Sequence, residues 1–385
     1  MTTRKRPGRT IPCPEGHTAF VPDPLPPSLE WSLGLVRALS DADRAIGRLA
    51  GEGGRLPNRH LLLRSFLRRE AVLSSRIEGT RATLGELLAA EAGAAVERAP
   101  EDLHEVGNCV SALEFGIERL RSLPLSLRLV RELHAHLTEG VRGHHATPGE
   151  FRRSQNWIGP AGCTLANAFY VPPPPAELPS ALGAWEAFLH DRTLPPLVHV
   201  ALCHYQFEAI HPFLDGNGRI GRVLVTLLLV ERGILPTPLL YLSAFFEATR
   251  QEYYARLLDV SARGAWPEWL AHFLNGVARQ AEDALSRAER INGLLTGWRL
   301  AAAGSPSRVV TALVDRLAEN PFWTVTRAAE RLGVAYTTAQ RAVEKLVSLS
   351  ILAPTSEARR DRVYCCREIL EILEEPARLT PAGSP

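Results

Sequence analysis

The amino-acid sequence predicts a mainly α-helical protein. Residues 58–78 and 218–232 carry apolar side chains at helical spacing, and they end at Gly79 and Gly233. The charged segment 276–300 also reads as a helix. We expect β structure only in a small hairpin in the middle of the chain and in a β-wing near the C-terminus.

Composition divides the chain into six parts. The first residues are basic and rich in proline, a Ser-Leu-Pro-Leu-Ser turn begins at Ser122, and an Ala/Gly/Ser/Pro stretch at 301–307 reads as a linker. We therefore expect an arm (1–27), an N-terminal helical domain (28–122), a central core (123–275), a helix with a linker (276–306), a helix–turn–helix unit (307–368) and a tail (369–385).

The overall composition is that of a globular protein. Of 385 residues, 45% are hydrophobic and 22% charged, which allows two or three domains. The longest apolar run, 223–230, is too short for a bilayer, and no apolar segment of a signal peptide follows the basic start. The six cysteines form no C-x-x-C pair, so we expect a cytoplasmic protein without a membrane partner. The net charge of +2 says little about nucleic acid.

The most informative stretch runs from His211 to Arg222 and reads HPFLDGNGRIGR. Gly216 and Gly218 flank Asn217, and all three tolerate positive φ, so we expect a tight turn whose N–H groups form an anion-binding nest. The helix that begins at Gly218 adds the positive end of its dipole to this nest. The turn therefore predicts a phosphate site.

The other polar residues of the stretch complete the chemistry. Arg219 and Arg222 are three apart, so we expect them to share a helix face and reach one polyphosphate. Asp215 offers a hard oxygen ligand that suits Mg²⁺. His211 precedes a proline, so it should end the preceding helix and face the site, where a neutral imidazole could take a proton from an attacking hydroxyl. Taken singly, each residue also fits an ordinary loop, surface or core role; the full set favours a nucleotide site.

At this point the chain resembles the Fic family, whose signature is His-Pro-Phe-x-Asp/Glu-Gly-Asn-Gly-Arg-x-x-Arg. Fic proteins are α-helical enzymes that usually transfer AMP from ATP to a Ser, Thr or Tyr hydroxyl of a protein. The resemblance implies that His211 is the general base, that Asp215 holds Mg²⁺ and that Arg222 binds the γ-phosphate. It implies an ATP site made of Gly216, Asn217, Gly218, Arg219, Ile220, Gly221 and Arg222. Related Doc-type kinases have lysine at the second glycine of the turn, so Gly218 favours AMP transfer.

A second motif, Ser-x-x-x-Glu-Gly, lies upstream at Ser74, Glu78 and Gly79. Ser74 and Glu78 are four apart and share one face of the helix over 58–78, so the carboxylate could pair with Arg222. Breaking a desolvated pair of this kind costs roughly 3–5 kcal/mol. The alternative is a helix-end glutamate in solvent. The resemblance implies an inhibitory motif in a built-in N-terminal helix.

Two further segments complete the expected core. Residues 149–175 read as a β-hairpin around Ile158 and Tyr170, which resembles the family's flap that pairs with the target backbone; the alternative is a plain surface hairpin. On the helix that begins near Arg250, Tyr254 is our choice to hold the adenine, with Tyr253 in reserve. A core tyrosine is the competing interpretation.

The C-terminal part resembles a winged helix. Helices are expected at 307–319, 326–334 and 335–349, followed by a wing over 350–366. Side chains that could reach DNA are Thr337, Thr338, Gln340 and Arg341, with wing residues Arg359, Arg360 and Arg362 on phosphates. Four glutamates follow within residues 368–375 and the unit is near neutral, so we favour a protein-interaction or homodimer role over DNA binding.

Two classes of function follow from these patterns. The first is a protein adenylyltransferase that uses ATP and Mg²⁺, modifies a protein hydroxyl (including its own) and is held down by Glu78. The second is a winged-helix DNA-binding regulator whose core senses nucleotide. His211 favours the first, because sensing alone would not require a base. An enzyme that also removes AMP, with Glu78 orienting a water, is a further alternative.

Overall fold

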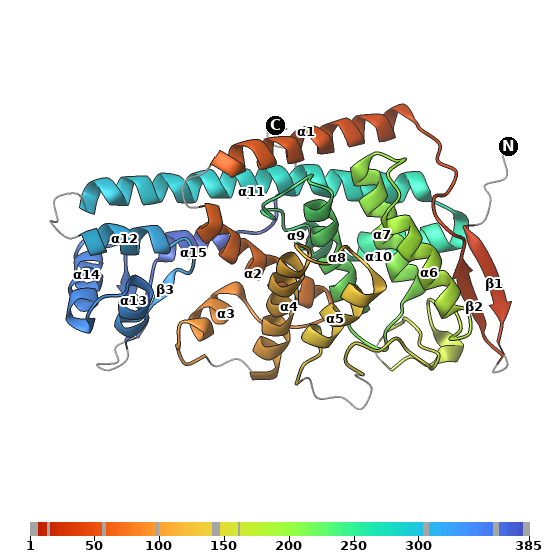
Figure 1. The fold of residues 1–385 in the computed structure, drawn as a ribbon, viewed down its shortest axis with the longest axis horizontal. Helices are drawn as coiled ribbons and strands as arrows, with labels where there is room; N and C mark the ends of the chain where they lie inside the picture. The colour runs from red at the N-terminus through yellow and green to blue at the C-terminus, as the bar shows by residue number, and fades with distance from the viewer. Residues whose placement is uncertain are drawn as a thin grey trace.

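The structure is a computed structural model that describes residues 7–13, 16–55, 59–96, 100–140, 147–160, 162–302, 308–356 and 362–379. Within these ranges the chain forms fifteen α-helices, one short 3₁₀ helix and two small antiparallel sheets (Figure 1). The predicted mainly α-helical fold is confirmed. Over the same ranges, none of the helices combines the length and apolar character needed to cross a membrane.

The first elements correct one expectation. Instead of an arm, the described residues before position 23 form an antiparallel hairpin in which Gly8 pairs with Pro22. The hairpin buries Ala19 and Val21, and the Phe20 N–H donates to the Val171 carbonyl. The elements of the N-terminal region are β1 (Gly8–Pro12), β2 (Thr18–Pro22), α1 (Leu33–Arg55), α2 (Arg59–Ile77), α3 (Leu84–Glu91) and α4 (Pro100–Arg119).

The central core is built around two adjacent helices, α7 and α8. Nearly every side chain of α7 is buried, and its apolar residues occupy all sides of the helix, as expected for the centre of a bundle. The core elements are α5 (Leu127–Leu137), η1 (Leu165–Asn167), α6 (Leu178–Leu189), α7 (Pro196–Ile210), α8 (Asn217–Glu231), α9 (Ser243–Ala248) and α10 (Arg250–Arg263).

One long helix, α11 (Trp266–Ala302), extends from the core to the C-terminal unit, and α1 lies along it (Figure 1). The sequence predicts a boundary between residues 275 and 276, and the structure shows that this boundary falls inside a continuous helix. Trp269, Phe273 and Val277 keep the buried face unbroken across that point, so nothing local ends the helix there.

The C-terminal unit has the order of elements that the sequence predicts. Gly333 ends α13 at φ 65° and turns the chain into α14, and the strands form an antiparallel sheet in the order β3-β5-β4. Residues 369–374 are helical instead of part of a tail, and Arg359 and Arg360 lie outside the described residues. The elements are α12 (Arg308–Arg316), β3 (Phe322–Trp323), α13 (Val325–Leu332), α14 (Tyr336–Ser348), β4 (Ala353–Pro354), β5 (Tyr364–Cys365) and α15 (Arg367–Glu374).

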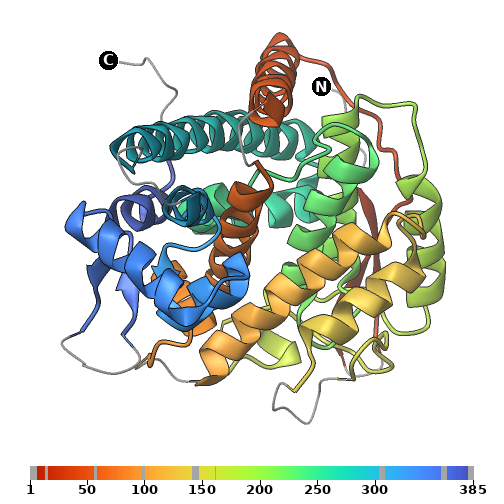
Figure 2. The same ribbon diagram turned by 60° about the vertical axis from the view of Figure 1, so that its left-hand side comes forward.

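Helix α2, which carries the upstream motif, is bonded to this unit (Figure 2). The Ser65 hydroxyl donates to the Ala318 carbonyl at 2.7 Å. The Arg69 guanidinium donates to the carbonyls of Leu373 and Glu375 at the end of α15. The C-terminal unit therefore helps to position the motif.

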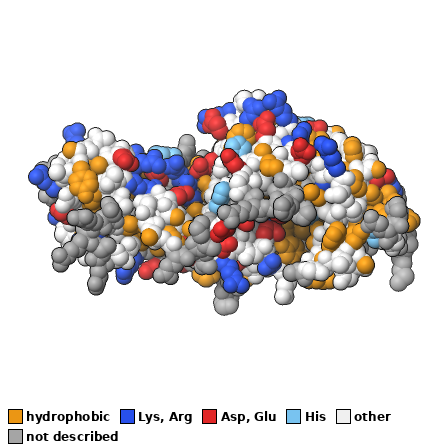
Figure 3. All heavy atoms as spheres, turned by 90° about the horizontal axis from the view of Figure 1, so that it is seen from below, with side chains coloured by type: hydrophobic (Ala, Val, Ile, Leu, Met, Phe, Trp, Pro, Cys, Tyr) orange, Lys and Arg blue, Asp and Glu red, His pale blue; other side chains and the backbone are white. Residues whose placement is uncertain are grey.

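The surface has no single charge on the face seen in Figure 3, where basic and acidic side chains are interspersed.

Candidate active site

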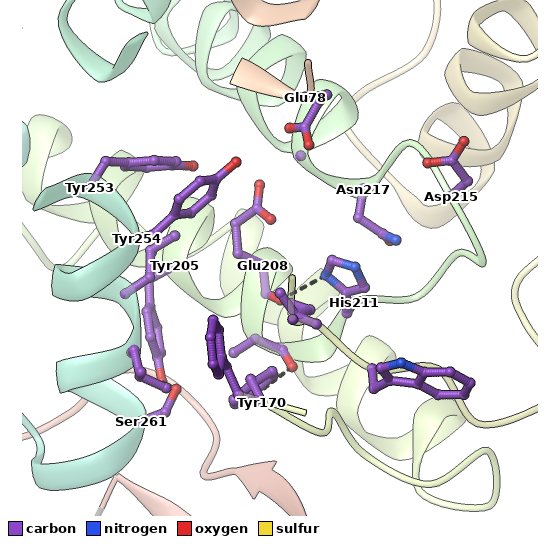
Figure 4. A pocket seen from close by; sticks show the side chains of 18 of the residues that line it. Glu78, Tyr170, Tyr205, Glu208, His211, Asp215, Asn217, Tyr253, Tyr254 and Ser261 are labelled. Atoms are coloured by element: carbon purple, nitrogen blue, oxygen red, sulfur yellow. Dashed lines mark hydrogen bonds between the residues drawn. The ribbon is translucent and has the colours of Figure 1, made fainter. Parts of the chain in front are cut away.

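A cavity of about 670 Å³ opens between α7, α8, α10 and the segment 157–170 (Figure 4). Its size is that of a small-molecule site, which commonly measures about 300–1,000 Å³. It brings together His211, Asp215, Gly216, Asn217, Gly218, Arg222, Tyr254 and Glu78, which come from three distant parts of the sequence.

His211 ends α7, as its position before a proline predicts. It adopts a left-handed conformation with φ 51°, and its N–H donates to the Phe207 carbonyl. Burial lowers the pKa of His211 to about 4, so the imidazole is neutral near pH 7. Nδ1 lies 3.3 Å from the Glu208 carbonyl, which can only accept, so in this pairing Nδ1 carries the proton and Nε2 keeps its lone pair.

The loop after His211 is shaped by residues that the sequence did not single out. Arg152 donates to the His211 carbonyl at 2.9 Å, and Asn156 donates to the Phe213 carbonyl at 2.8 Å. The ring of His134 stacks on Phe213 with centroids 3.8 Å apart. These contacts depend on residues 55 or more positions away, so no local pattern reveals them.

The turn at residues 216–218 differs from the expected nest. Gly216 has φ 80° and precedes α8, whereas Asn217 and Gly218 are already helical. Of the three residues that tolerate positive φ, only Gly216 adopts it, and Gly218 belongs to the helix as the sequence predicts. A Cβ at Gly218 would overlap the Glu78 carboxylate in its present position, so the close approach of Glu78 depends on this glycine. The helix still presents its N-terminus to the cavity, where free N–H groups favour anions.

Arg222 is the most enclosed charge of the site, with 2% of its surface exposed. Its Nε donates to the Ser74 hydroxyl at 2.8 Å, and its Nη2 donates to the Ser74 carbonyl at 3.0 Å and to the Glu78 carboxylate at 2.6 Å. The ion pair that the upstream motif predicts is present. Gly79 follows directly with φ 109°, a conformation that favours glycine.

Arg219 takes a different direction from the expected one. It pairs with Glu105 of α4 at 3.3 Å and with Asp215 at 3.6 Å, and it does not line the cavity. Two other residues of the expected ATP site, Ile220 and Gly221, are buried behind the cavity wall. The spacing of three places the two arginines near one face, but α4 supplies Arg219 with a partner of its own.

Asp215 is the one predicted metal ligand. Its side chain is 67% exposed at the cavity, and one carboxylate oxygen accepts from the Gly216 N–H. In the described parts of the chain, no three His, Cys, Asp or Glu side chains gather to hold a metal. The residues thus fit an ion bound by one carboxylate together with nucleotide phosphates and water, which is how Mg²⁺ is commonly held.

The structure separates the two candidate tyrosines of α10. Tyr254 is 40% exposed to the cavity, and its hydroxyl lies 3.4 Å from the Ile77 carbonyl. Tyr253 is 1% exposed, and its hydroxyl lies 2.9 Å from Nε2 of His204. A ring that must meet a ligand is better placed at Tyr254.

The expected flap hairpin is reduced to a single bridge between Ile158 and Tyr170. Gly159 and Pro160 interrupt one side, and η1 occupies the connection, so regular strands do not form. The Tyr170 hydroxyl donates to the Ala209 carbonyl of α7, which ties the bridge to the cavity.

Two acids were missed by the sequence analysis, a half-buried one on α7 and a buried one on α2. Glu208 lines the cavity one turn before His211, and burial raises its pKa to about 7. Glu70 on α2 accepts from the Ser243 N–H at 3.0 Å and from its hydroxyl, and burial also raises the pKa of Glu70 to about 7. For Glu208 the sequence did contain a signal, because it is a single acid within an otherwise apolar helix.

Comparison with known proteins matches residues 36–118 to the family model "Fic/DOC family N-terminal" and residues 124–229 to "Fic/DOC family". The chain is 32% identical over 168 residues to "Protein adenylyltransferase Fic" of Drosophila yakuba, covering 42% of this chain and 31% of that protein. The same-named protein of Drosophila virilis is 33% identical, with 42% and 32% covered. The chain thus spans about a third of the length of these curated relatives.

Solved structures agree in fold. A Fic family protein from Desulfovibrio desulfuricans superposes with a TM-score of 0.60 at 20% identity, covering 89% of this chain and 98% of that one. Fic-1 from C. elegans has a TM-score of 0.50 at 25% identity, with 66% and 73% covered. Two adjacent family models, the intact motif and the shared fold lead to one conclusion: residues 36–118 and 124–229 are the two domains of the Fic/DOC family.

Proposed function

We propose that this protein transfers AMP from ATP to a hydroxyl group of a protein. The observation that carries the proposal is the placement of His211. Its imidazole is neutral and faces the cavity beside the N-terminus of α8, so a base and a phosphate-binding helix end share one space. The relatives named protein adenylyltransferase support the same chemistry.

The cavity suggests how ATP would lie. Tyr254 offers an aromatic face to the adenine, and the N-terminus of α8 offers N–H groups to the α- and β-phosphates. Arg222 offers a guanidinium to the γ-phosphate once it is free of Glu78. Asp215 would hold Mg²⁺ together with phosphate oxygens, and the ion would neutralise charge on the leaving pyrophosphate.

The transfer step needs one proton acceptor. Nε2 of His211 takes the proton from the target hydroxyl, whose oxygen then attacks the α-phosphorus of ATP. The bond from that phosphorus to the bridging oxygen breaks, and pyrophosphate leaves with the electron pair. The product is an AMP ester on the target, with His211 protonated until it passes the proton to solvent.

Glu78 would keep this reaction off. Its carboxylate holds Arg222 at 2.6 Å and lies against Gly218, where a phosphate would have to bind. Breaking a fully buried pair costs roughly 3–5 kcal/mol, or about two to four orders of magnitude in binding, and this half-buried pair should suppress productive ATP binding by less than that. Glu78 is also 36% exposed toward the cavity, so the carboxylate could orient a water for removal of AMP from a modified protein.

Transfer of label from α-³²P-ATP with Mg²⁺ tests the proposal, with cell extract as the source of target protein. Glu78→Gly should label protein strongly, and Glu78→Gly with His211→Ala should not. A matched reaction with γ-³²P-ATP should leave protein unlabelled, because the γ-phosphate departs in pyrophosphate. Label from the γ position, or equal labelling with and without His211, would contradict AMP transfer by this site.

A further inference from the structure

Glu208 has no role in the chemistry described so far, yet it occupies the middle of the cavity. It stands on α7 one turn before His211 and lines the cavity wall. Figure 4 shows its carboxyl group between Tyr254 on one side and His211 with Asn217 on the other. It therefore lies between the aromatic part of the cavity and the phosphate-binding helix end.

The carboxyl group lacks an internal partner. Its Oε1 is buried and accepts no hydrogen bond from any described residue. Buried polar oxygens are nearly always bonded, and an unmet one carries a cost, so a carboxyl group that lines the cavity without a protein donor is available to accept from a ligand. The fold also makes room for this group, because a Cβ at Gly221 of α8 would overlap Oε1.

The geometry of a nucleotide dictates what must lie beside Glu208. When the base is at Tyr254 and the α-phosphate is at the start of α8, the sugar spans the distance between them. A ribose presents two adjacent hydroxyl donors, and a glutamate or aspartate oxygen is the usual acceptor for them in nucleotide sites. The electrostatic neighbours of the carboxyl group are Arg222 and Glu78.

We propose that Glu208 binds the ribose hydroxyls of the nucleotide and makes the enzyme select ribonucleotides over deoxyribonucleotides. This inference rests on the proposed function. It goes beyond that function by assigning the recognition of the sugar to a residue outside the family motif. A site built to bond a hydroxyl rejects the analogue that lacks it, because its own polar atoms are left unpaired.

The test compares ATP, 2′-deoxy-ATP and 3′-deoxy-ATP with the full chain carrying Glu78→Gly. Glu208→Ala and Glu208→Gln are added to that background, and Glu289→Gln, an exposed acid of α11, is the matched control. Equilibrium binding by calorimetry and steady-state labelling are both measured. Circular dichroism and thermal melting first establish that each variant is folded.

At pH 8, where Glu208 is mostly ionised, the parent should prefer ATP over at least one deoxy analogue by roughly 10- to 100-fold in Kd, as expected for loss of a bond to a charged acceptor. Glu208→Ala should raise the Kd of ATP by that factor and leave the Kd of the deoxy analogue nearly unchanged. The ratio of the two Kd values should then be close to 1. Glu208→Gln, which still accepts a hydrogen bond, should retain part of the preference, and Glu289→Gln should retain all of it.

Equal weakening of all three nucleotides by Glu208→Ala would overturn the inference and show that Glu208 acts through Arg222 instead. A parent that does not distinguish the three nucleotides would also overturn it. The binding assay separates the proposed AMP transfer from the proposed recognition of the ribose. If nucleotides bind selectively but no label is transferred, the proposed function fails while the sugar recognition by Glu208 stands.

Discussion

At the scale of single residues, the contact that we propose to be inhibitory is a set of three hydrogen bonds from one guanidinium. Glu78 supplies the charge, while Ser74 supplies both its hydroxyl and its carbonyl oxygen. Only the hydroxyl and the carboxylate depend on side-chain identity. The two side chains should therefore contribute unequally to holding Arg222.

We predict that Ser74→Ala raises AMP labelling, but less than Glu78→Gly does. The variant leaves the Glu78 ion pair in place and removes one bond to a charged donor, worth roughly 1.5–3 kcal/mol. Initial rates of α-³²P transfer measure the effect. Ser75→Ala is the matched control, since the neighbouring Ser75 hydroxyl is buried without a partner among the described residues. An equal rise in both variants would point to loosening of α2 instead.

At the scale of elements, α2 is held from two sides. Glu70 binds Ser243 of the core, and Arg69 binds carbonyls at the end of α15. Ser74 lies on the same helix, and Glu78 follows directly after its last residue, Ile77. How firmly the helix is held therefore affects how firmly Arg222 is occupied.

We predict that Arg69→Met lowers the thermal unfolding midpoint and raises basal labelling. The variant keeps the length of the buried stem and removes two charge-assisted bonds, which together cost about 3–6 kcal/mol. Calorimetry and the labelling assay measure the two effects. Arg44→Met, an exposed residue of α1, is the control. A loss of stability with no rise in labelling would show that the hold on α2 is separate from inhibition.

The sequence predicts elements well where the signal is local. The helix over 58–78 and the end of α7 at His211 needed only periodicity, a stop glycine and a proline. The N-terminal hairpin was missed because its outer edge is completed by Val171, far along the chain. The direction of Arg219 was missed for the same reason, since its partner Glu105 belongs to α4. Periodicity therefore predicts the helices, whereas contacts between distant parts of the sequence determine the hairpin and the direction of the Arg219 side chain.

At the scale of the whole molecule, buried titratable groups set the dependence of stability on pH. Burial lowers the pKa of His134, His199, His204, His211 and His272 to about 4, or about 3 for His204. Unfolded histidines take up protons below about pH 6.5, so folding loses stability as the pH falls toward 4. Glu70 and Glu208 oppose this trend, because their raised pKa values favour the folded state in acid.

The five histidines should outweigh the two acids. We predict a loss of about 3 kcal/mol in the free energy of unfolding between pH 7 and pH 5.5, measured by urea titration. Glu70→Gln removes one opposing group, so its loss over the same interval should be steeper. A flat profile, or a gain of stability in acid, would mean that these histidines are charged in the folded protein.

The 37 residues of α11 have a mechanical consequence. At 1.5 Å per residue the helix is a rod of about 55 Å, and Arg287 on it grips the end of α15. Arg69 of α2 also donates to carbonyls at the end of α15, so α11, α15 and α2 are joined by hydrogen bonds at one place. A displacement of the C-terminal unit would therefore move α2 as well, and it would change the distance between Glu78 and Arg222.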